Sequence, residues 1–203
     1  KLDLDKPLNS YLPEPYLANE PLHGRITARM VLTHTGGFPN WRNDKPLHVH
    51  HEPGTAFLYS GEGFVFLQRV IEQITGLDYE AFMQQTLLRP LSMHDSSHVW
   101  QEQFTQTAAA GHDDSGRPKT NRKLYARPNA AFSLYCTPRD YAAFVLEMMS
   151  PVRTAAHSLQ ADTLQAVLSP SSPPTGHALL LRRGQVGNGD TRYGLGWLIE
   201  PTP

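Results

Sequence analysis

One long stretch of the chain repeats hydrophobic residues at helical spacing. Within residues 62–75 the apolar positions lie three or four residues apart, and two more widen the stripe: Phe64, Leu67, Ile71 and Ile74, with Phe66 and Val70. Residues at these intervals share one face of an α-helix, which can then pack against a core. Gly76 follows where a glycine commonly ends a helix in the left-handed conformation. The pattern predicts a helix over 62–75.

Shorter helices are predicted where a capping residue precedes an apolar stripe. Thr27, Asp78 and Thr137 have side chains that accept a hydrogen bond from the first turn of a helix. We expect helices through 28–32, through 82–88 as far as Pro90, and through 138–148, with further helical segments at 8–11 and 161–168. The helix after Thr27 is expected to stop at Thr35-Gly36-Gly37, because glycine permits a left-handed turn.

Strand-like patterns are short and lie mainly toward the C-terminal part of the chain. Residues 178–181 and 192–199 favour strands, with a turn at 187–190 between them. Residues 55–59 are predicted to be extended, and residues 92–130 are polar and irregular. Together these patterns predict a mixed chain of many short elements.

Composition narrows the classes of function. The 203 residues suffice for one domain of ordinary size or two small ones. Lys and Arg number 18 against 19 Asp and Glu, a formal net charge of −1, so we predict no nucleic-acid partner. No apolar run approaches the ~20 residues of a membrane helix. The single cysteine, Cys136, excludes an internal disulfide, and its apolar neighbours Leu134 and Tyr135 favour a packed core thiol.

Ten histidines raise the question of a metal site, above all in the run His48-Val49-His50-His51. Alternate residues on a strand share a face, so His48 and His50 could chelate a metal ion. Lone clusters of this kind are usually solvated surface, and no acidic or histidine partner stands at a recognised ligand spacing. We therefore predict no metal and no cofactor, and keep a metal-binding module built on His48, His50 and His51 as a distant alternative.

Six phrases in a fixed order carry a family resemblance. They are Leu32-Thr-His-Thr-Gly-Gly-Phe-Pro39, Glu52-Pro-Gly-Thr-Ala-Phe-Leu-Tyr-Ser-Gly61, Val70-Ile-Glu-Gln-Ile-Thr-Gly76, Leu88-Arg-Pro-Leu-Ser-Met93, Ala130-Ala-Phe-Ser-Leu-Tyr-Cys-Thr137 and Tyr193-Gly-Leu-Gly-Trp197. Together they resemble the serine β-lactamase-like family, which includes class C β-lactamases, D-alanyl-D-alanine carboxypeptidases and related esterases. The resemblance runs from Lys1 to about Trp197.

The resemblance implies a fold and a catalytic tyrosine. The fold is the α+β, β-lactamase/transpeptidase-like architecture, with residues 1–203 forming a single partial domain, mainly the helical domain plus a few strands of the sheet domain. Such enzymes form an acyl-enzyme: a serine in Ser-x-x-Lys attacks the carbonyl, and the lysine and a tyrosine manage its proton. Tyr59 matches the tyrosine of the middle motif, Tyr-x-Asn. The role requires nearby cations that lower the tyrosine pKa from about 10; the alternative is an aromatic that only packs.

The departures from the family pattern shape the functional prediction. Gly61 replaces the asparagine of the middle motif, which disfavours efficient β-lactamase activity and favours an esterase or peptidase. No Ser-x-x-Lys occurs, and the closing Lys/His-Thr/Ser-Gly strand is also missing, so we expect a fragment that lacks the N-terminal motif region and the C-terminal sheet strands. Trp41 stands where relatives present a substrate-contacting residue, which favours an apolar or acyl-chain ligand; the alternative is a loop tryptophan that covers the core.

We therefore expect a fragment of a serine hydrolase acting on a β-lactam, a D-amino-acid peptide or an ester, inactive by itself. The alternative is a non-catalytic penicillin-recognising or sensor module in which Tyr59 is only structural. The expected partner is a small-molecule or peptide substrate, with no membrane span in this segment. Apolar surface where missing strands would dock could mediate self-association. The resemblance implies a periplasmic or other extracytoplasmic location.

Overall fold

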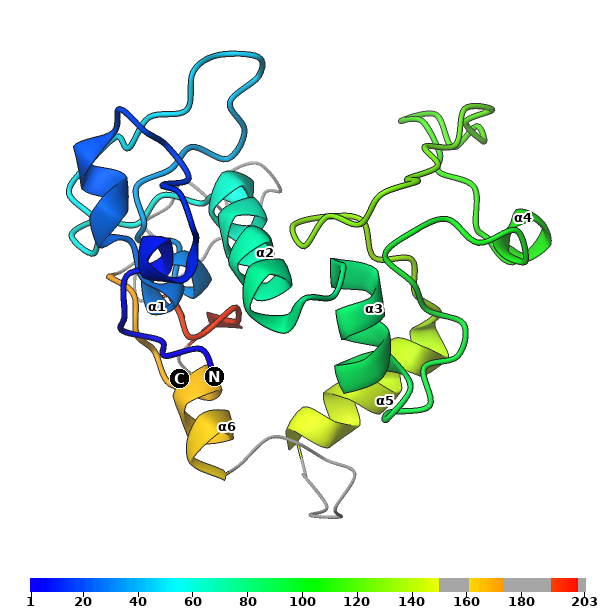
Figure 1. Cartoon of the computed structure of the whole chain (residues 1–203). Helices are drawn as coiled ribbons and strands as arrows, with labels where there is room; N and C mark the ends of the chain where they lie inside the picture. Colours follow the sequence, from blue (N-terminus) through cyan, green and yellow to red (C-terminus); the bar gives the residue numbers. More distant parts are fainter. Residues whose placement is uncertain (150–160, 174–190, 201–203) are drawn as a thin grey trace. The chain divides into compact units, whose positions relative to one another are not determined.

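The computed structural model describes residues 1–149, 161–173 and 191–200 (Figure 1). The chain divides into two compact units, one formed by residues 1–77 and 158–203 and the other by residues 78–157. The predicted strand at 178–181 and the predicted turn at 187–190 lie outside the described residues.

The first unit is built around one long helix. Its elements are η1 (Leu8–Tyr11), η2 (Pro21–Arg25), α1 (Ala28–Leu32), α2 (Gly61–Thr75), α6 (Ala161–Leu168), β1 (Arg192–Tyr193) and β2 (Leu198–Ile199). Helix α2 packs against both η1 and α1, which lie beside it in Figure 1. Leu8, Ile26, Phe66 and Val70 are fully buried and form the centre of the core.

Helix α2 confirms the prediction from the hydrophobic spacing and begins one residue earlier than expected. The Ser60 hydroxyl accepts a hydrogen bond from the Gly63 amide at 2.9 Å and so caps the first turn. Gly76 ends the helix with φ +69°, a conformation that costs glycine little. Both ends are therefore fixed by local sequence.

Helix α1 spans the predicted residues 28–32 and is capped as predicted by Thr27, but the glycines do not form the turn that ends it. It ends at Leu32, and the first left-handed residue is His34, with φ +55°. Gly37 also has a positive φ, +86°, and a Cβ there would lie 2.8 Å from the His51 carbonyl oxygen. The glycine thus permits close approach of two loops rather than ending the helix.

The C-terminal segment corrects another expectation, because residues 192–199 do not form one strand. They form a small antiparallel hairpin in which Arg192 pairs with Ile199 and Tyr193 with Leu198. The Gly194 amide donates to the Trp197 carbonyl at 2.8 Å, and Gly196 turns the chain with φ +84°. Two glycines therefore reverse the chain where alternation alone predicted continuous extension.

The second unit is a set of short helices joined by long loops. Its elements are α3 (Tyr79–Met83), the π-helical turn η3 (Gln84–Leu88), α4 (Phe104–Thr107) and α5 (Pro138–Met149). Asp78 and Thr137 cap α3 and α5 as predicted, through hydrogen bonds of 3.0 and 3.1 Å to amides in the first turns. The short helix α4 interrupts the segment that was predicted to be irregular throughout.

Candidate functional site

Tyr59 lies in a cluster of rings centred on His34. The Tyr59 ring stacks on the His34 imidazole, with centroids 4.2 Å apart. Tyr193 meets the same imidazole edge-on at 4.8 Å, and Phe57 and Phe64 lie at 5.9 and 5.4 Å from it. The cluster brings together residues from the loop after α1, the segment before α2, α2 itself and the C-terminal hairpin.

His34 also holds the backbone on both sides of Tyr59. Its carbonyl oxygen accepts from the Leu58 amide at 2.8 Å, and its ring nitrogen Nδ1 accepts from the Ser60 amide at 3.0 Å. Burial lowers the pKa of His34 from 6.5 to about 4, so the ring is neutral at pH 7. Because Nδ1 accepts, the neutral ring carries its proton on Nε2.

The two tyrosines of the cluster differ in their access to solvent. Tyr59 is 40% exposed, whereas Tyr193 is only 8% exposed. Burial, with a smaller contribution from Tyr59, raises the pKa of Tyr193 to about 12. Tyr193 therefore keeps its proton, and Tyr59 is the tyrosine of this cluster that a substrate could reach.

Trp41 and Gly61, the two predicted substrate-binding residues, lie in contact. A Cβ built on Gly61 would fall 2.5 Å from the Cη2 and Cζ2 atoms of the Trp41 ring. Real carbon atoms do not approach so closely, so the indole occupies the space that any larger side chain at position 61 needs. Trp41 itself remains 36% exposed. It therefore presents an aromatic surface next to the start of α2.

The loop that carries Trp41 is tied to the first turn of α2. The Asn40 carbonyl oxygen accepts from the amides of both Gly61 and Glu62 at 3.1 Å. The Ser60 hydroxyl donates to the Pro39 carbonyl oxygen at 2.9 Å. These bonds satisfy amides that a helix start leaves without partners, and they hold the tryptophan in place.

The residue after Trp41 forms an ion pair that also ties this loop to α2. The Arg42 guanidinium donates to both carboxylate oxygens of Glu62, at 2.7 Å from Nη2 and 3.1 Å from Nε. The Arg42 amide also donates to Glu62 Oε1 at 3.1 Å. Glu62 is buried, and its hydrogen bonds raise the pKa of Arg42 further above its usual range. This bidentate pair fixes both backbone and side chain of the residue after Trp41.

Comparison with known proteins identifies the family. A model of the beta-lactamase family matches residues 1–203. The chain belongs to the beta-lactamase family. A probable hydrolase M10 of Phoma sp. (strain ATCC 20986 / MF5453) is 33% identical to this beta-lactamase-family chain over 98 residues, 46% of this chain and 15% of that protein.

Two solved structures share the fold of this beta-lactamase-family chain. An octameric penicillin-binding protein homologue from Pyrococcus abyssi matches with a TM-score of 0.73 and 20% identity, over 98% of this chain and 48% of that chain. A D-alanine carboxypeptidase from Burkholderia cenocepacia matches with a TM-score of 0.73 and 21% identity, over 100% of this chain and 54% of that chain. The β-lactamase/transpeptidase-like fold, mostly helical here with few strands, is confirmed. The chain spans about half the length of these structures.

The histidines at 48–51 of this beta-lactamase-family chain contact different partners. His48 Nδ1 lies 3.4 Å from Glu20 Oε2, and His51 Nδ1 lies 3.0 Å from the Glu52 carbonyl oxygen. In the described ranges, no three metal-ligating side chains come together, and no helix is long and apolar enough to cross a membrane. Cys136 is half-buried and receives a hydrogen bond from the Ser96 hydroxyl, so it is not the core thiol we expected.

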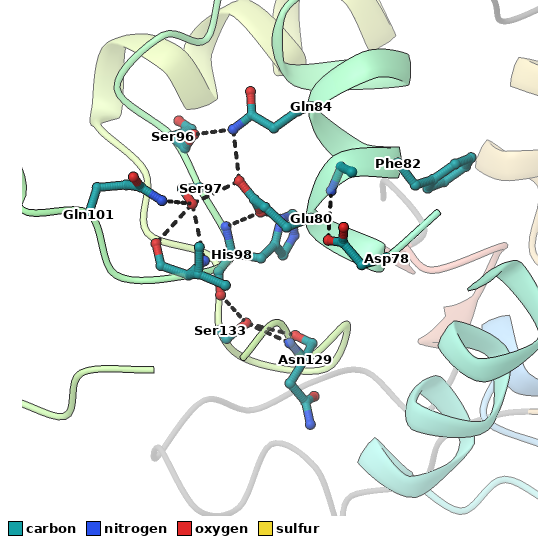
Figure 2. Close-up of polar contacts among 12 residues, drawn as sticks. Asp78, Glu80, Phe82, Gln84, Ser96, Ser97, His98, Gln101, Asn129 and Ser133 are labelled. Atoms are coloured by element: carbon teal, nitrogen blue, oxygen red, sulfur yellow. Dashed lines mark hydrogen bonds and ion pairs between the residues drawn. The ribbon is translucent and has the colours of Figure 1, made fainter. Parts of the chain in front are cut away.

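The second unit contains a serine, a histidine and a glutamate in contact, which Figure 2 shows around Glu80. The Ser97 hydroxyl lies 2.8 Å from Glu80 Oε1, and the His98 amide donates to Glu80 Oε2 at 2.7 Å. A catalytic triad would need the histidine ring between the serine and the carboxylate. Here the carboxylate bonds the serine directly, and both Ser97 and His98 are buried. The arrangement anchors the Ser97–His98 segment to α3.

The sequence prediction did not single out His34, whereas it assigned Tyr59, Trp41 and Gly61 from the family resemblance, and these three roles stay predictions. His34 lies within one of the six quoted phrases, yet it was one histidine among ten. Its importance comes from contacts with residues 57–60, which are more than twenty positions away. These contacts form only because the loop after α1 pairs with the segment before α2, and the sequence alone does not show that pairing.

Proposed function

We propose that Tyr59 handles the proton in a serine-hydrolase site that works through an acyl-enzyme. The nucleophilic serine then comes from a Ser-x-x-Lys motif, which these 203 residues lack, in a longer protein that contains this chain. Tyr59, as phenolate, takes the proton of the serine hydroxyl while that oxygen bonds the carbonyl carbon. It returns the proton to the leaving alkoxide as the ester bond breaks, and water then releases the acyl group by the same route.

This proposal rests on one observation: His34 holds Tyr59 in place while leaving the tyrosine exposed to solvent. His34 stacks on one face and bonds the amides on either side, while the tyrosine remains 40% exposed. Because His34 is neutral at pH 7, it brings no cation to lower the tyrosine pKa. The lysine of Ser-x-x-Lys is therefore assigned that task in the longer protein.

We further propose an ester with an apolar acyl chain as the substrate class, rather than a β-lactam. Gly61 offers no side-chain amide at the position where the family motif has asparagine. The Trp41 ring fills the space beside it and presents an aromatic surface, which suits an apolar acyl group. A β-lactam or a D-amino-acid peptide would lack the amide contact at this place.

The test is Tyr59→Phe in the longer protein, measured as kcat/KM for p-nitrophenyl butyrate. Removal of the hydroxyl keeps the ring on His34, so the fold should survive and kcat/KM should fall by roughly 100-fold, the usual worth of a positioned general acid or base. Tyr193→Phe is the matched control, because it removes a hydroxyl from the same cluster at a buried tyrosine. We expect this control to keep kcat/KM within about threefold.

Equal kcat/KM in wild type and a folded Tyr59→Phe variant would show that Tyr59 only packs. The rival, a penicillin-recognising sensor, makes a different prediction for the wild-type protein. It would form a stable adduct with benzylpenicillin, seen as a mass increase, and would show no ester turnover. The first outcome contradicts the role of Tyr59, and the second contradicts the proposed hydrolase.

A further inference from the structure

The second unit contains a cavity that the family resemblance does not explain. Its volume is about 530 Å³, and it lies beside α4 and the start of α5. Cavities of roughly 300–1,000 Å³ are typical of small-molecule sites. The lining combines aromatic, aliphatic and polar side chains, among them Trp100, Phe104, Arg122, Tyr135 and Cys136. None of these residues takes part in the cluster around Tyr59.

The apolar walls of the cavity are held in place by contacts with each other. The Trp100 ring meets Phe104 and Tyr135 edge-on, with centroids 5.8 and 5.4 Å apart. The Tyr135 hydroxyl donates to the Lys123 carbonyl oxygen and accepts from the Tyr125 amide, both at 2.9 Å. These contacts restrain the rings that line the cavity. Such preorganisation lowers the entropic cost of binding an apolar group.

A cation lies at the edge of these walls. The Arg122 guanidinium sits 5.3 Å from the centroid of the Trp100 ring, and its Nη2 donates to the Ala108 carbonyl oxygen at 2.8 Å. A guanidinium has five N–H donors, so groups remain for an anion. The surrounding segment 117–127 carries five basic residues and no acidic one. The one acidic lining residue, Asp95, is exposed.

We propose that this cavity binds a small amphipathic carboxylate. The apolar body packs against Trp100, Phe104 and Tyr135, and the carboxylate pairs with Arg122. Arginine binds carboxylates through two parallel hydrogen bonds, and the Arg122 guanidinium lies over the Trp100 ring that forms part of the wall. Both an alkyl and an aryl carboxylate fit this chemistry, and the proposal does not depend on the role of Tyr59.

Calorimetry on the protein tests the proposal with dodecanoate and with 2-naphthoate. Their neutral counterparts, dodecan-1-ol and 2-naphthalenemethanol, carry the same apolar bodies without the charge. We expect at least one carboxylate to bind about tenfold more tightly than its alcohol, because a charge-assisted pair is lost. The tighter of the two carboxylates identifies the body that the walls prefer.

Cys136 reports where binding occurs, because it is the only cysteine and lines the cavity. Alkylation of its thiol by iodoacetamide, followed by mass spectrometry, should slow when the carboxylate is bound. Arg122→Gln should weaken carboxylate binding about tenfold and leave alcohol binding unchanged. Arg127→Gln removes a basic residue of the same segment that does not line the cavity, and should change neither.

Three outcomes would overturn the proposal. The first is equal affinity for carboxylates and alcohols, which would indicate adsorption to apolar surface alone. The second is carboxylate binding that leaves the alkylation rate of Cys136 unaltered. The third is equal loss of affinity in Arg122→Gln and Arg127→Gln, which would indicate general charge attraction. If Arg122→Gln fails to fold, Ala109→Phe adds a ring to the cavity lining and should abolish the slowing of alkylation.

Discussion

His34 decides the geometry around Tyr59, because its ring and its carbonyl oxygen hold the backbone on both sides of that tyrosine. The ring can accept from the Ser60 amide only while it is neutral. Its burial among Tyr59, Tyr193 and the phenylalanines disfavours the charged form and lowers its pKa to about 4. Stability and site geometry are thus linked through one imidazole.

This linkage predicts a pH dependence of stability. The folded-state pKa of His34, about 4, lies below the unfolded value of 6.5, so protons bind the unfolded state more strongly between these values. The contribution is fully present above pH 6.5 and is lost as the pH falls toward 4. The pKa difference corresponds to about 3 kcal/mol. Urea unfolding of the wild type from pH 7 to pH 4 should show this loss.

Two histidine variants separate this effect from general acid denaturation. In His34→Gln the same titration should lack the His34 contribution, so its free energy of unfolding should change by about 3 kcal/mol less. His50→Gln alters an exposed histidine of the same unit and should follow the wild type. Parallel curves for wild type and His34→Gln would contradict the assignment.

Gly61 and Gly63 provide a matched pair in the first turn of α2. A Cβ at Gly61 would clash with the Trp41 ring, whereas one at Gly63 would meet its nearest neighbours at 3.4 and 3.5 Å. We expect Gly61→Ala to lower the free energy of unfolding by about 1–3 kcal/mol through overpacking. Gly63→Ala should be neutral or stabilise by up to about 1 kcal/mol, because alanine favours helix.

Trp41→Ala should remove most of the cost of Gly61→Ala, because it takes away the ring that clashes. Urea unfolding of the two single variants and the double variant measures this coupling. Additive free energies would show that the ring does not limit position 61. In that case the Trp41 ring would not explain why glycine stands at position 61 in place of the family's asparagine.

At the scale of elements, the sequence predicts a helix when nearby residues specify both its ends and its apolar face. Helix α2 has a cap at Ser60, an apolar stripe and Gly76, so its bounds were found to within one residue. The hairpin at 192–199 could not be predicted, because one strand and a tight hairpin share the same alternation. Gly194 packs so closely on the Val167 carbonyl that a Cβ has no room, and that is a tertiary contact.

The same division applies to the site. Tyr59 and Gly61 could be assigned from a motif, but the contact of Trp41 with Gly61 depends on how the loop 39–42 folds back on α2. The support from His34 likewise joins residues from two separate loops. Neither contact leaves a periodic signal, since each depends on chain reversals whose geometry the local residues do not specify.

Glu80 is the polar centre of the second unit, and its replacement should loosen that unit locally. Glu80 accepts from the Ser97 hydroxyl, the His98 amide and the Gln84 side chain. Glu80→Gln turns one acceptor oxygen into a donor and leaves a buried amide unpaired, at a cost of about 1–3 kcal/mol. Hydrogen exchange at the His98 amide should then speed up about tenfold or more.

Glu102→Gln is the control for this change, because Glu102 is an exposed glutamate of the same unit. Exchange at the His98 amide should be unaltered in this variant. An unchanged rate in Glu80→Gln would show that the carboxylate does not hold the Ser97–His98 segment. The contact would then be incidental to the stability of α3.

At the scale of the molecule, the family model covers all 203 residues, yet the chain spans only about half of the related structures. The prediction of a single partial domain, the extracytoplasmic location and self-association through a sheet-docking surface stay predictions. Under the proposed function, the catalytic groups would be divided in the same way. Tyr59 is in this chain, whereas the Ser-x-x-Lys motif is not.

This distribution predicts that the 203-residue chain has no turnover of its own. Neither the serine next to Tyr59 nor the serine bonded to Glu80 is suited to replace the nucleophile. Ser60 is buried and bonded to the Pro39 carbonyl, and Ser97 is buried and bonded to Glu80. Without a serine that attacks the carbonyl, the covalent route is lost and Tyr59 has no proton to transfer.

Hydrolysis of p-nitrophenyl acetate and of nitrocefin should equal the rate in buffer. Tyr59→Phe should leave that background unchanged, which separates it from weak catalysis by the phenol. A saturable rate that an active-site inhibitor abolishes would show instead that these residues contain a complete catalytic site.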